Sequence, residues 1–278
     1  MAERRIPAPY RTTVLRTEQL TPHMIRVVLG GDDLKQRFTA GAYTDHYVKL
    51  QLPRPDSPEP FDPAEIRRTL PRDRWPITRT YTVRAWDPAS AELTLDFVVH
   101  GDTGVAGPWA ASAAPGDVLW LAGPGGAYRP SPDASWHLLA GDESALPAIA
   151  ASLEQLPTNA KAIAILEVAS QADELPLPAH PNLTTTWLHR NGTPIGQKLT
   201  TAIEALDFPD NDVQAFIHGE AGLVRSIRRN LRQTRQLPLS QLSISGYWRQ
   251  GTTEDGWQST KQSWNAQVEA EESNTPKN

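Results

Sequence analysis

Cysteine is absent from the 278-residue chain. The protein therefore has no disulfide, no thiolate nucleophile, and no iron–sulfur cluster or zinc ion held by its own cysteines. Long apolar runs are also absent, since no stretch reaches the roughly 18 residues of a membrane-spanning helix. The opening residues, MAERRIPAPY, contain no apolar segment of a secretory signal. These absences lead us to expect a cytoplasmic protein with no membrane partner.

Positive charge is in slight deficit, with 27 Lys and Arg against 32 Asp and Glu and a net charge of −5. A chain of this charge is not expected to attract nucleic acid. Its seven histidines form no H-x-x-x-H pair, so a metal site of that type is not expected. No G-x-S-x-G segment occurs, which argues against a serine hydrolase.

Proline is abundant, with 25 residues, and seven of them lie within residues 53–76. That stretch predicts a loop insertion with one helical turn near residues 64–69. The rest of the first half consists of short segments rich in Val, Leu, Thr and aromatic residues, which predict a small sandwich or barrel. We expect a six-stranded antiparallel β-barrel domain over residues 1–130. Its expected strands are residues 12–17, 23–29, 46–52, 80–86, 92–100 and 118–122.

The second half alternates strands with helices, a pattern typical of a parallel α/β sheet. The expected strands are residues 136–141, 161–168, 183–189, 213–218 and 242–248, and the expected helices are residues 144–156, 194–206 and 220–236. We therefore expect an α/β domain over residues 131–264. The polar end of the chain, residues 265–278, is predicted to be a frayed tail.

Residues 79–82, RTYT, begin the fourth expected strand. Strand alternation puts Arg79 and Tyr81 on one side and Thr80 and Thr82 on the other. A cation, an aromatic ring and a hydroxyl at this spacing suit a phosphate, a flat ring and a ring nitrogen. The same residue types are also ordinary in a strand.

Two glycine-rich segments follow. Residues 100–110, HGDTGVAGPWA, describe a loop that enters a helix, whose free N–H groups would bind a pyrophosphate or merely form a turn. Residues 123–128, GPGGAY, lack the G-x-G-x-x-G pattern and open no helix. They allow close approach of the backbone to something flat, or simply turn the chain.

The order of these motifs resembles the ferredoxin-NADP reductase superfamily. Four segments resemble one branch of it, the siderophore-interacting protein family of FAD-dependent ferric-siderophore reductases: residues 45–53 (DHYVKLQLP), 79–84 (RTYTVR), 140–149 (AGDESALPAI) and 246–251 (GYWRQG). The resemblance runs from about residue 10 to about residue 260. It implies an FAD-binding barrel followed by a domain similar to NAD(P)H-binding domains.

The resemblance also implies which residues hold FAD. Arg79 would bind the pyrophosphate, Tyr81 would lie against the isoalloxazine, and Thr82 would lie near its reactive nitrogen. His100 and the loop after it would hold the ribityl-phosphate and adenine side, and Trp248 would lie over the flavin ring or belong to the core. The full set of expected cofactor residues is Arg79, Tyr81, Thr82, His100, Gly104, Val105, Ala106, Gly107, Trp109 and Trp248.

Ferric siderophores are neutral to strongly anionic, and the family holds them with basic side chains beside the flavin. The matching positions are Lys49, Arg249 and, more weakly, Arg129, each of which would otherwise be a solvated surface cation. One electron turns tightly held Fe(III) into weakly held Fe(II), so the iron leaves. No acid, base or nucleophile is implied, and the iron is bound through the siderophore alone.

The electron donor is left open between NAD(P)H and a reduced ferredoxin. Asp142 and Glu143 suit a helix N-terminus but would repel the pyrophosphate of NAD(P)H. Five arginines between residues 225 and 235 would either dock an acidic ferredoxin or form a solvated helix face.

Two functions of other kinds remain open. One is a general NAD(P)H- or ferredoxin-dependent flavin oxidoreductase, for which iron chelates are incidental substrates. The other is a non-redox siderophore-binding module, which would purify without flavin.

Overall fold

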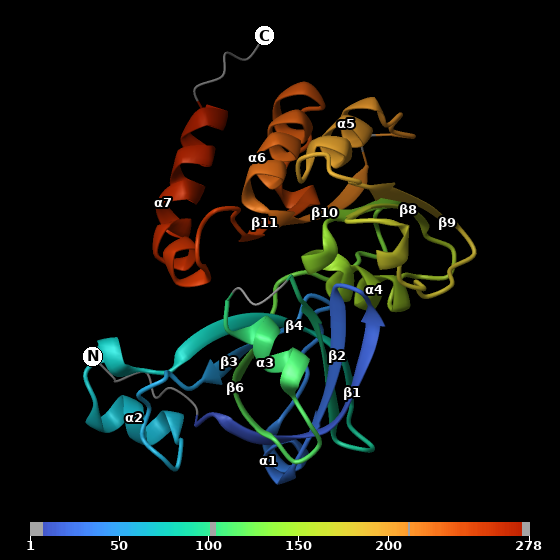
Figure 1. Ribbon diagram of the computed structural model, residues 1–278. Coiled ribbons are helices and arrows are strands. Elements are labelled where there is room, and N and C mark those ends of the chain that lie inside the picture. Colours follow the sequence, from blue (N-terminus) through green and yellow to red (C-terminus); the bar gives the residue numbers. More distant parts are fainter. Residues whose placement is uncertain (1–7, 101–103, 211, 274–278) are drawn as a thin grey trace, which may run out of the picture. The chain divides into compact units, whose positions relative to one another are not determined.

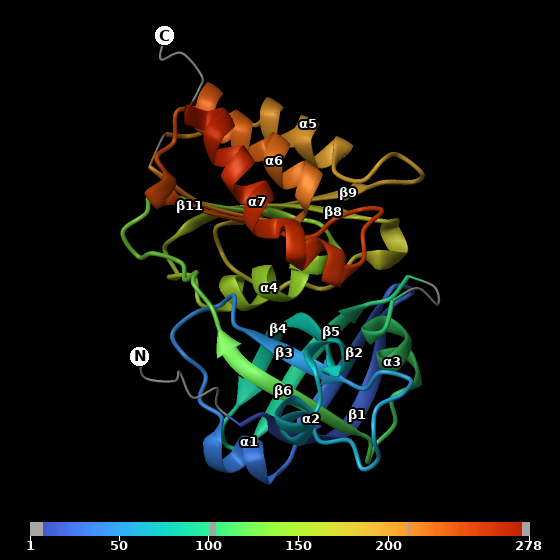
Figure 2. The same cartoon turned by 90° about the vertical axis from the view of Figure 1, so that its left-hand side faces the viewer.

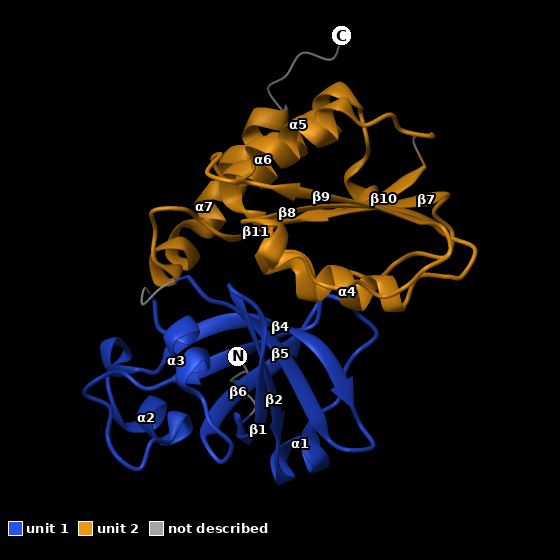
Figure 3. Cartoon of the chain, turned by 45° about the vertical axis from the view of Figure 1, so that its right-hand side comes forward, with its two compact units in different colours: residues 1–127 blue, residues 128–278 orange. Residues whose placement is uncertain are grey.

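The structure, a computed structural model, describes residues 8–100, 104–210 and 212–273 (Figure 1). The chain divides into two compact units, Met1–Ala127 and Tyr128–Asn278, which are coloured separately in Figure 3. The division lies close to the expected domain boundary after residue 130. Each unit is described below by itself.

Unit 1 is a closed barrel in which every neighbouring pair of strands is antiparallel, in the order β1-β2-β5-β4-β3-β6. The predicted six-stranded barrel is therefore confirmed. The strands are β1 (Tyr10–Thr21), β2 (Met24–Gly30), β3 (Tyr47–Leu52), β4 (Ile77–Asp87), β5 (Glu92–Val98) and β6 (Val118–Gly125).

Alternation along the strands builds the barrel core, as in β5, where Leu93, Leu95 and Phe97 are fully buried. Three short helices, α1 (Asp32–Arg37), α2 (Pro63–Thr69) and α3 (Ala106–Ser112), and a 3₁₀ turn (Arg72–Arg74) join the strands. Helix α2 is the helical turn expected within the proline-rich insertion. It begins where the Asp62 carboxylate accepts hydrogen bonds from the N–H groups of Ala64 and Glu65.

Unit 2 is a five-stranded parallel sheet in the order β11-β10-β7-β8-β9, which confirms the predicted α/β architecture. Helices α5, α6 and α7 cover one face and α4 covers the other (Figure 2). The strands are β7 (Trp136–Gly141), β8 (Lys161–Val168), β9 (Leu183–His189), β10 (Val213–Glu220) and β11 (Leu242–Trp248). The helices are α4 (Leu146–Glu154), α5 (Gln197–Ala205), α6 (Ala221–Arg229) with a π turn (Asn230–Thr234), and α7 (Glu254–Ser273), with 3₁₀ turns at Glu143–Ala145, Gln171–Asp173 and Leu239–Gln241.

Helix α7 differs from the frayed tail expected from residue 265, because the helix continues through Ser273. Trp257, Trp264 and Val268 recur at helical spacing and are buried against the same core as α5 and α6. The segment is largely polar apart from these three residues, so its composition did not indicate a packed helix. No described helix is both long and apolar enough to cross a bilayer.

The arginines of α6 and the turn after it make contacts within unit 2. Arg225 pairs with Glu271 and Arg228 with Glu272 of α7. Arg232 donates to the Leu237 carbonyl, and Arg235 donates to carbonyls at the end of α5. Four of the five arginines considered for ferredoxin docking are thus engaged inside the unit.

The two ion pairs of α7 are expected to differ in strength. Arg228 and Glu272 are 12% and 11% exposed, whereas Arg225 and Glu271 are 46% and 47% exposed. Glu272→Gln should lower the free energy of unfolding by about 1–3 kcal/mol, because a shielded arginine loses its charged partner. The matched control Glu271→Gln should cost under about 0.5 kcal/mol. Urea unfolding of both variants measures the difference, and equal losses would contradict it.

Candidate functional site

The RTYT strand of unit 1 places Arg79 and Tyr81 on the inner side of the barrel. In the antiparallel pairing of β3 with β4, Arg79 lies opposite Leu50 and Tyr81 opposite Val48. Residues directly opposite one another share a face, and Leu50 and Val48 are fully buried. Arg79 is accordingly 8% exposed, and its guanidinium donates to the Thr78 carbonyl at 2.8 Å.

Lys49 lies on the other face of the same two strands. It is opposite Thr80, and both residues are exposed. Thr82 is opposite Tyr47 on that outer face, and it is buried. The structure therefore brings Arg79 and Tyr81 together and directs Lys49 away from them.

A row of aromatic rings links the RTYT strand to helix α3. The ring centroids of Tyr81 and Phe97 are 4.3 Å apart with planes inclined by 32°, and those of Phe97 and Trp109 are 5.7 Å apart. Two predicted cofactor residues, Tyr81 and Trp109, thus contact the same ring. Phe97 was not predicted for the site; it is fully buried in β5, and its alternation with Leu93 and Leu95 was the signal that could have placed it inside the barrel.

The glycine-rich loop enters α3 as expected, although residues 101–103 of this motif lie outside the described residues. Gly104 has φ +86°, and no atom of the described residues would lie within 4 Å of a Cβ at this position. A Cβ at Gly107 would lie 3.4 Å from the Val98 carbonyl oxygen, because α3 packs on the end of β5. The N-cap residue of α3 is Val105, whose apolar side chain cannot accept a hydrogen bond from the N–H groups of the first turn. Ala106 is buried, whereas His100 is exposed.

These residues fit a flavin dinucleotide. A shielded guanidinium and uncapped N–H groups at a helix start suit a pyrophosphate, and the partly exposed Tyr81 ring suits a flat heterocycle. None of the described residues covers Gly104 on the side where a Cβ would stand. The donors are cationic or neutral, as a diphosphate requires.

The GPGG segment, residues 123–126, contains the last three residues of β6 and the glycine that follows it, and Gly125 and Gly126 lie against side chains of residues 43–47. A Cβ at Gly125 would overlap the Tyr47 ring, and one at Gly126 would lie 2.9 Å from Tyr43 Cβ. The Asp45 carboxylate accepts from the Ala127 N–H at 2.8 Å. The close approach to something flat is therefore present, and the flat group is Tyr47 of the chain itself.

In unit 2, the carboxyl edge of the sheet carries the buried Asp142. Its Oδ1 accepts from Ser144 N at 2.9 Å and Ser144 Oγ at 2.5 Å, and its Oδ2 accepts from Glu220 N at 2.7 Å and Trp248 Nε1 at 2.9 Å. Burial raises the pKa of Asp142 to about 6, against the opposing effect of these hydrogen bonds. The prediction that Asp142 suits a helix start is confirmed.

Two more carboxylates cap helices along this edge. Glu167 is fully buried and accepts from the N–H groups of Gly196 and Leu199 at the start of α5, at 2.7 and 3.0 Å. Glu220 accepts from the N–H groups of Gly222 and Leu223 at the start of α6. The helix starts that would attract a pyrophosphate therefore already hold carboxylates.

Glu143 is neutralised within the unit. It pairs with Arg190, which approaches it through both terminal nitrogens and also lies 3.7 Å from Glu167. Burial alone would lower the pKa of Arg190, but its hydrogen bond to Glu143 and the charges of Glu143 and Glu167 outweigh that effect. The pKa of Arg190 is therefore raised. The charge expected to repel a dinucleotide at residue 143 is thus balanced by a partner that sequence spacing did not reveal.

The predicted cations of unit 2, Arg129 and Arg249, are exposed, and Trp248 is half-buried. A further cation, Lys261, was not predicted from the sequence as a site residue. Its Nζ donates to Ser245 Oγ at 3.1 Å, and burial lowers its pKa. Its spacing of four residues from Trp257 on α7 was the signal that would have placed it on the buried face.

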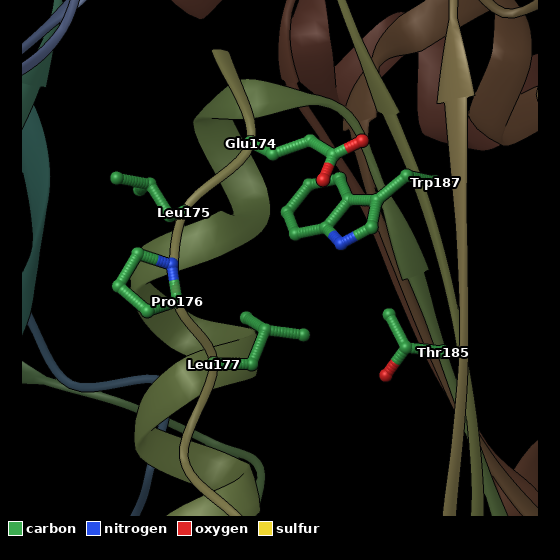
Figure 4. A pocket seen from close by; sticks show the side chains of 6 residues that line it. All are labelled: Glu174, Leu175, Pro176, Leu177, Thr185 and Trp187. Atoms are coloured by element: carbon green, nitrogen blue, oxygen red, sulfur yellow. The ribbon is translucent and has the colours of Figure 1, made fainter. Parts of the chain in front are cut away.

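A hollow of about 410 Å³ lies between β9 and the segment that follows the Gln171–Asp173 turn. Figure 4 shows Trp187 and Thr185 of β9 on one side and Glu174 and Leu177 on the other. Glu174 is fixed there by His189, whose Nε2 lies 2.6 Å from its Oε1. None of the predicted site residues lines this hollow.

Comparison with known proteins covers both units. Residues 13–128 match the siderophore-interacting FAD-binding domain, and residues 134–251 match the siderophore-interacting protein family. The ferric vibriobactin reductase ViuB of Vibrio cholerae is 33% identical over 246 residues, covering 87% of this chain and 90% of that protein. The NADPH-dependent ferric-chelate reductase of Escherichia coli is 31% identical over 242 residues, covering 85% and 91%.

A solved structure agrees. The siderophore utilization protein from T. fusca is 38% identical and superposes with a TM-score of 0.76, covering 90% of this chain and 98% of that one. The two family matches cover both units of the fold and include the four segments on which the resemblance was based. The chain therefore belongs to the siderophore-interacting protein family.

Proposed function

We propose that this protein reduces ferric siderophores through bound FAD and so releases iron as Fe(II) in the cytoplasm. The observation that carries the proposal is the shielded Arg79 beside Tyr81 on one face of β4, in a unit that matches a siderophore-interacting FAD-binding domain. The names of two relatives, a ferric vibriobactin reductase and a ferric-chelate reductase, support the reaction class.

FAD supplies the redox chemistry, because a flavin accepts a hydride pair and passes on single electrons. Arg79 binds the pyrophosphate, and Tyr81 lies against the isoalloxazine with its ring supported by Phe97. The resemblance would also place the Thr82 hydroxyl near the reactive nitrogen, although its side chain lies on the face of β4 opposite to Arg79 and Tyr81. His100 and the backbone of residues 104–109 would hold the phosphate and adenine side. Trp248 of unit 2 is the remaining residue proposed for the cofactor.

The side chains of the substrate site bind the iron chelate and take no part in the reaction itself. The exposed cations Lys49 and Arg249, with Arg129 as a weaker third, attract anionic iron chelates and place few demands on their shape. Fe(II) is held far more weakly than Fe(III) by hard oxygen ligands, so reduction alone frees the metal. The chain contributes no acid or base to this step.

NAD(P)H is the favoured electron donor, because a relative of 31% identity is named an NADPH-dependent reductase. The carboxylates on the helix starts of unit 2 require the dinucleotide to bind away from them. A reduced ferredoxin is the second donor to test, although four of the arginines considered for its docking contact unit 2 itself.

The test is the visible spectrum of the purified protein, followed anaerobically as NADPH and then a ferric siderophore are added. We expect a flavin band that bleaches and then returns while a ferrous chelator develops colour. A band that responds only to reduced ferredoxin would change the donor. No flavin band after incubation with FAD would contradict the proposal and favour a non-redox siderophore-binding module.

Removing Lys49 or Arg249 tests the substrate assignment. Lys49→Ala and Arg249→Ala should each raise the half-saturating concentration of an anionic ferric siderophore about three- to tenfold, because each removes one attractive charge. The maximal rate and the FAD content should stay the same. Lys35→Ala, an exposed lysine on α1, is the matched control. Unchanged kinetics in both variants would favour a general flavin oxidoreductase with iron chelates as incidental substrates.

A further inference from the structure

Two exposed tyrosines lie beside a lysine at the start of β3. Tyr47 and Lys49 leave the strand on the same outer face, about 7 Å apart along it. Tyr43 lies in the segment that leads into the strand. Tyr43 and Tyr47 are 44% and 37% exposed, whereas every other aromatic side chain in the described parts of the chain is buried or half-buried. The exposed aromatic surface is thus gathered at one place on unit 1.

Glycines of the neighbouring strand give these tyrosines their place. Strand β3 lies between β4 and β6 in the barrel (Figure 2). A Cβ at Gly125, the last residue of β6, would overlap the Tyr47 ring, and a Cβ at Gly126 would lie 2.9 Å from Tyr43 Cβ. Each tyrosine therefore lies against a glycine, and a side chain at either position would push the tyrosine away.

Lys49 supplies positive charge beside the rings. Its neighbours on the outer face are small, Thr80 on β4 and Ala122 on β6. No ion pair joins Lys49 to another of the described residues. Its ammonium group is therefore available to an anion from solution.

The same outer face carries Thr82, which is paired with Tyr47. In the function proposed above, the Thr82 hydroxyl lies near the reactive nitrogen of the flavin, and Lys49 attracts the iron chelate. Tyr47 stands between these two positions on the strand pair. A chelate attracted by Lys49 thus meets the Tyr47 ring.

An exposed ring beside a cation distinguishes two classes of iron chelate. Catecholate and phenolate ligands hold iron through oxygens on flat aromatic rings, whereas carboxylate and hydroxamate ligands are aliphatic. Charge attracts anionic complexes of either class and makes few demands on their shape. Aromatic rings also attract one another in offset or edge-to-face arrangements, beyond the area that they bury.

We propose that Tyr43 and Tyr47 make this protein selective for aromatic iron chelates, of the catecholate or phenolate class, over aliphatic chelates of equal charge. The proposal rests on the function proposed above and names its substrate class. Lys49 provides the attraction that both classes share, and the tyrosines provide the difference.

The experiment measures the binding of two ferric complexes to the oxidised full chain, with and without FAD, by isothermal titration calorimetry. One is the complex of a synthetic hexadentate tris(catecholamide), and the other is tris(oxalato)ferrate, both in the same excess of oxalate. Both surround iron with six oxygens and carry three negative charges. We expect the catecholate complex to bind about tenfold more tightly, because each ring contact adds to the shared charge attraction. Equal dissociation constants would overturn the proposal.

Variants assign the difference to the rings. Tyr47→Leu should weaken the catecholate complex about three- to tenfold and leave the oxalate complex unchanged. Gly125→Ala keeps the tyrosine but displaces its ring, so it should have the same effect. Tyr47→Phe should keep the selectivity, and Lys49→Ala should weaken both complexes equally. Val118→Ala, at an exposed apolar residue of the same barrel, is the matched control. An equal loss for both complexes in Tyr47→Leu would overturn the proposal.

Reduction separates this proposal from the proposed function. If the reduced flavoprotein forms no Fe(II) from either complex while binding stays selective, the proposed function fails and the selectivity of the tyrosines stands. If Fe(II) forms from both complexes with equal half-saturating concentrations, the proposed function stands and the selectivity fails.

Discussion

Arg79→Ala is expected to weaken FAD binding about 100-fold. Arginine binds phosphate through two parallel charge-assisted hydrogen bonds, and losing them costs about 3 kcal/mol, or two factors of ten in affinity. The effect should be large at this position because Arg79 is 8% exposed, so water screens its charge only weakly. Quenching of flavin fluorescence during titration with the apoprotein measures the dissociation constant.

Two variants sharpen this test. Arg79→Lys keeps the charge but loses the planar fork, and should fall between the wild type and Arg79→Ala. Lys49→Ala removes a cation from the opposite face of the same strand pair and should leave FAD affinity unchanged. Wild-type affinity in a folded Arg79→Ala protein would exclude Arg79 from the pyrophosphate site.

The barrel was predictable because each of its strands has a recognisable local sequence pattern. In β5 the alternation of Leu93, Leu95 and Phe97 with polar neighbours fixes both the strand and its inner face. The predicted bounds were short mainly where strands run past their apolar core, as in β1, which continues to Thr21, and β6, which includes the glycines through Gly125. Gly125, which the sequence also allowed as part of a turn, pairs with Tyr47 of β3 after an irregularity in the ladder, and the Tyr47 ring lies against it.

Contacts between distant segments were not predictable. The pairing of Glu143 with Arg190 spans 47 residues, and Glu167 reaches the start of α5 about 30 residues later. A buried carboxylate looks the same in sequence as a solvated one, so the local pattern gave only the charge at residue 143 and not its neutralisation. The same limit hid the ion pairs that hold α7.

The candidate site was predictable as a set of motifs but not as a geometry. Alternation placed Arg79 and Tyr81 together, and the structure agrees. The opposite direction of Lys49 depends on the register of β3 against β4, which no single strand encodes. The roles of Lys49, Arg129 and Arg249 therefore remain predictions that the kinetic variants test.

Acid should destabilise this protein through His218, a buried imidazole of β10. It stacks on Phe216 with centroids 3.9 Å apart, and its Nε2 lies 3.0 Å from Ser243 Oγ. Among the described residues its Nδ1 has no hydrogen-bond partner. Burial, reinforced by the nearby Lys261 ammonium, lowers the pKa of His218 to about 3.

The sign follows from proton binding. An unfolded histidine takes up its proton near pH 6.5, whereas folded His218 stays neutral down to about pH 3, so the unfolded state binds more protons between these values. The stability that His218 contributes is complete above pH 6.5 and is lost as the pH falls. The loss is about 2 kcal/mol between pH 6.5 and 4.5.

His218→Gln should remove that part of the pH dependence, because glutamine has no proton to bind. The free energy of unfolding in urea, measured at pH 6.5 and 4.5, should fall about 2 kcal/mol less in the variant than in the wild type. Asp142 titrates with the opposite sign, but it is present in both proteins and cancels in the comparison. His23→Gln, which changes an exposed histidine, should show the same change in the free energy of unfolding between the two pH values as the wild type. If His218→Gln also showed the wild-type change, His218 would be protonated in the folded protein and the prediction would be wrong.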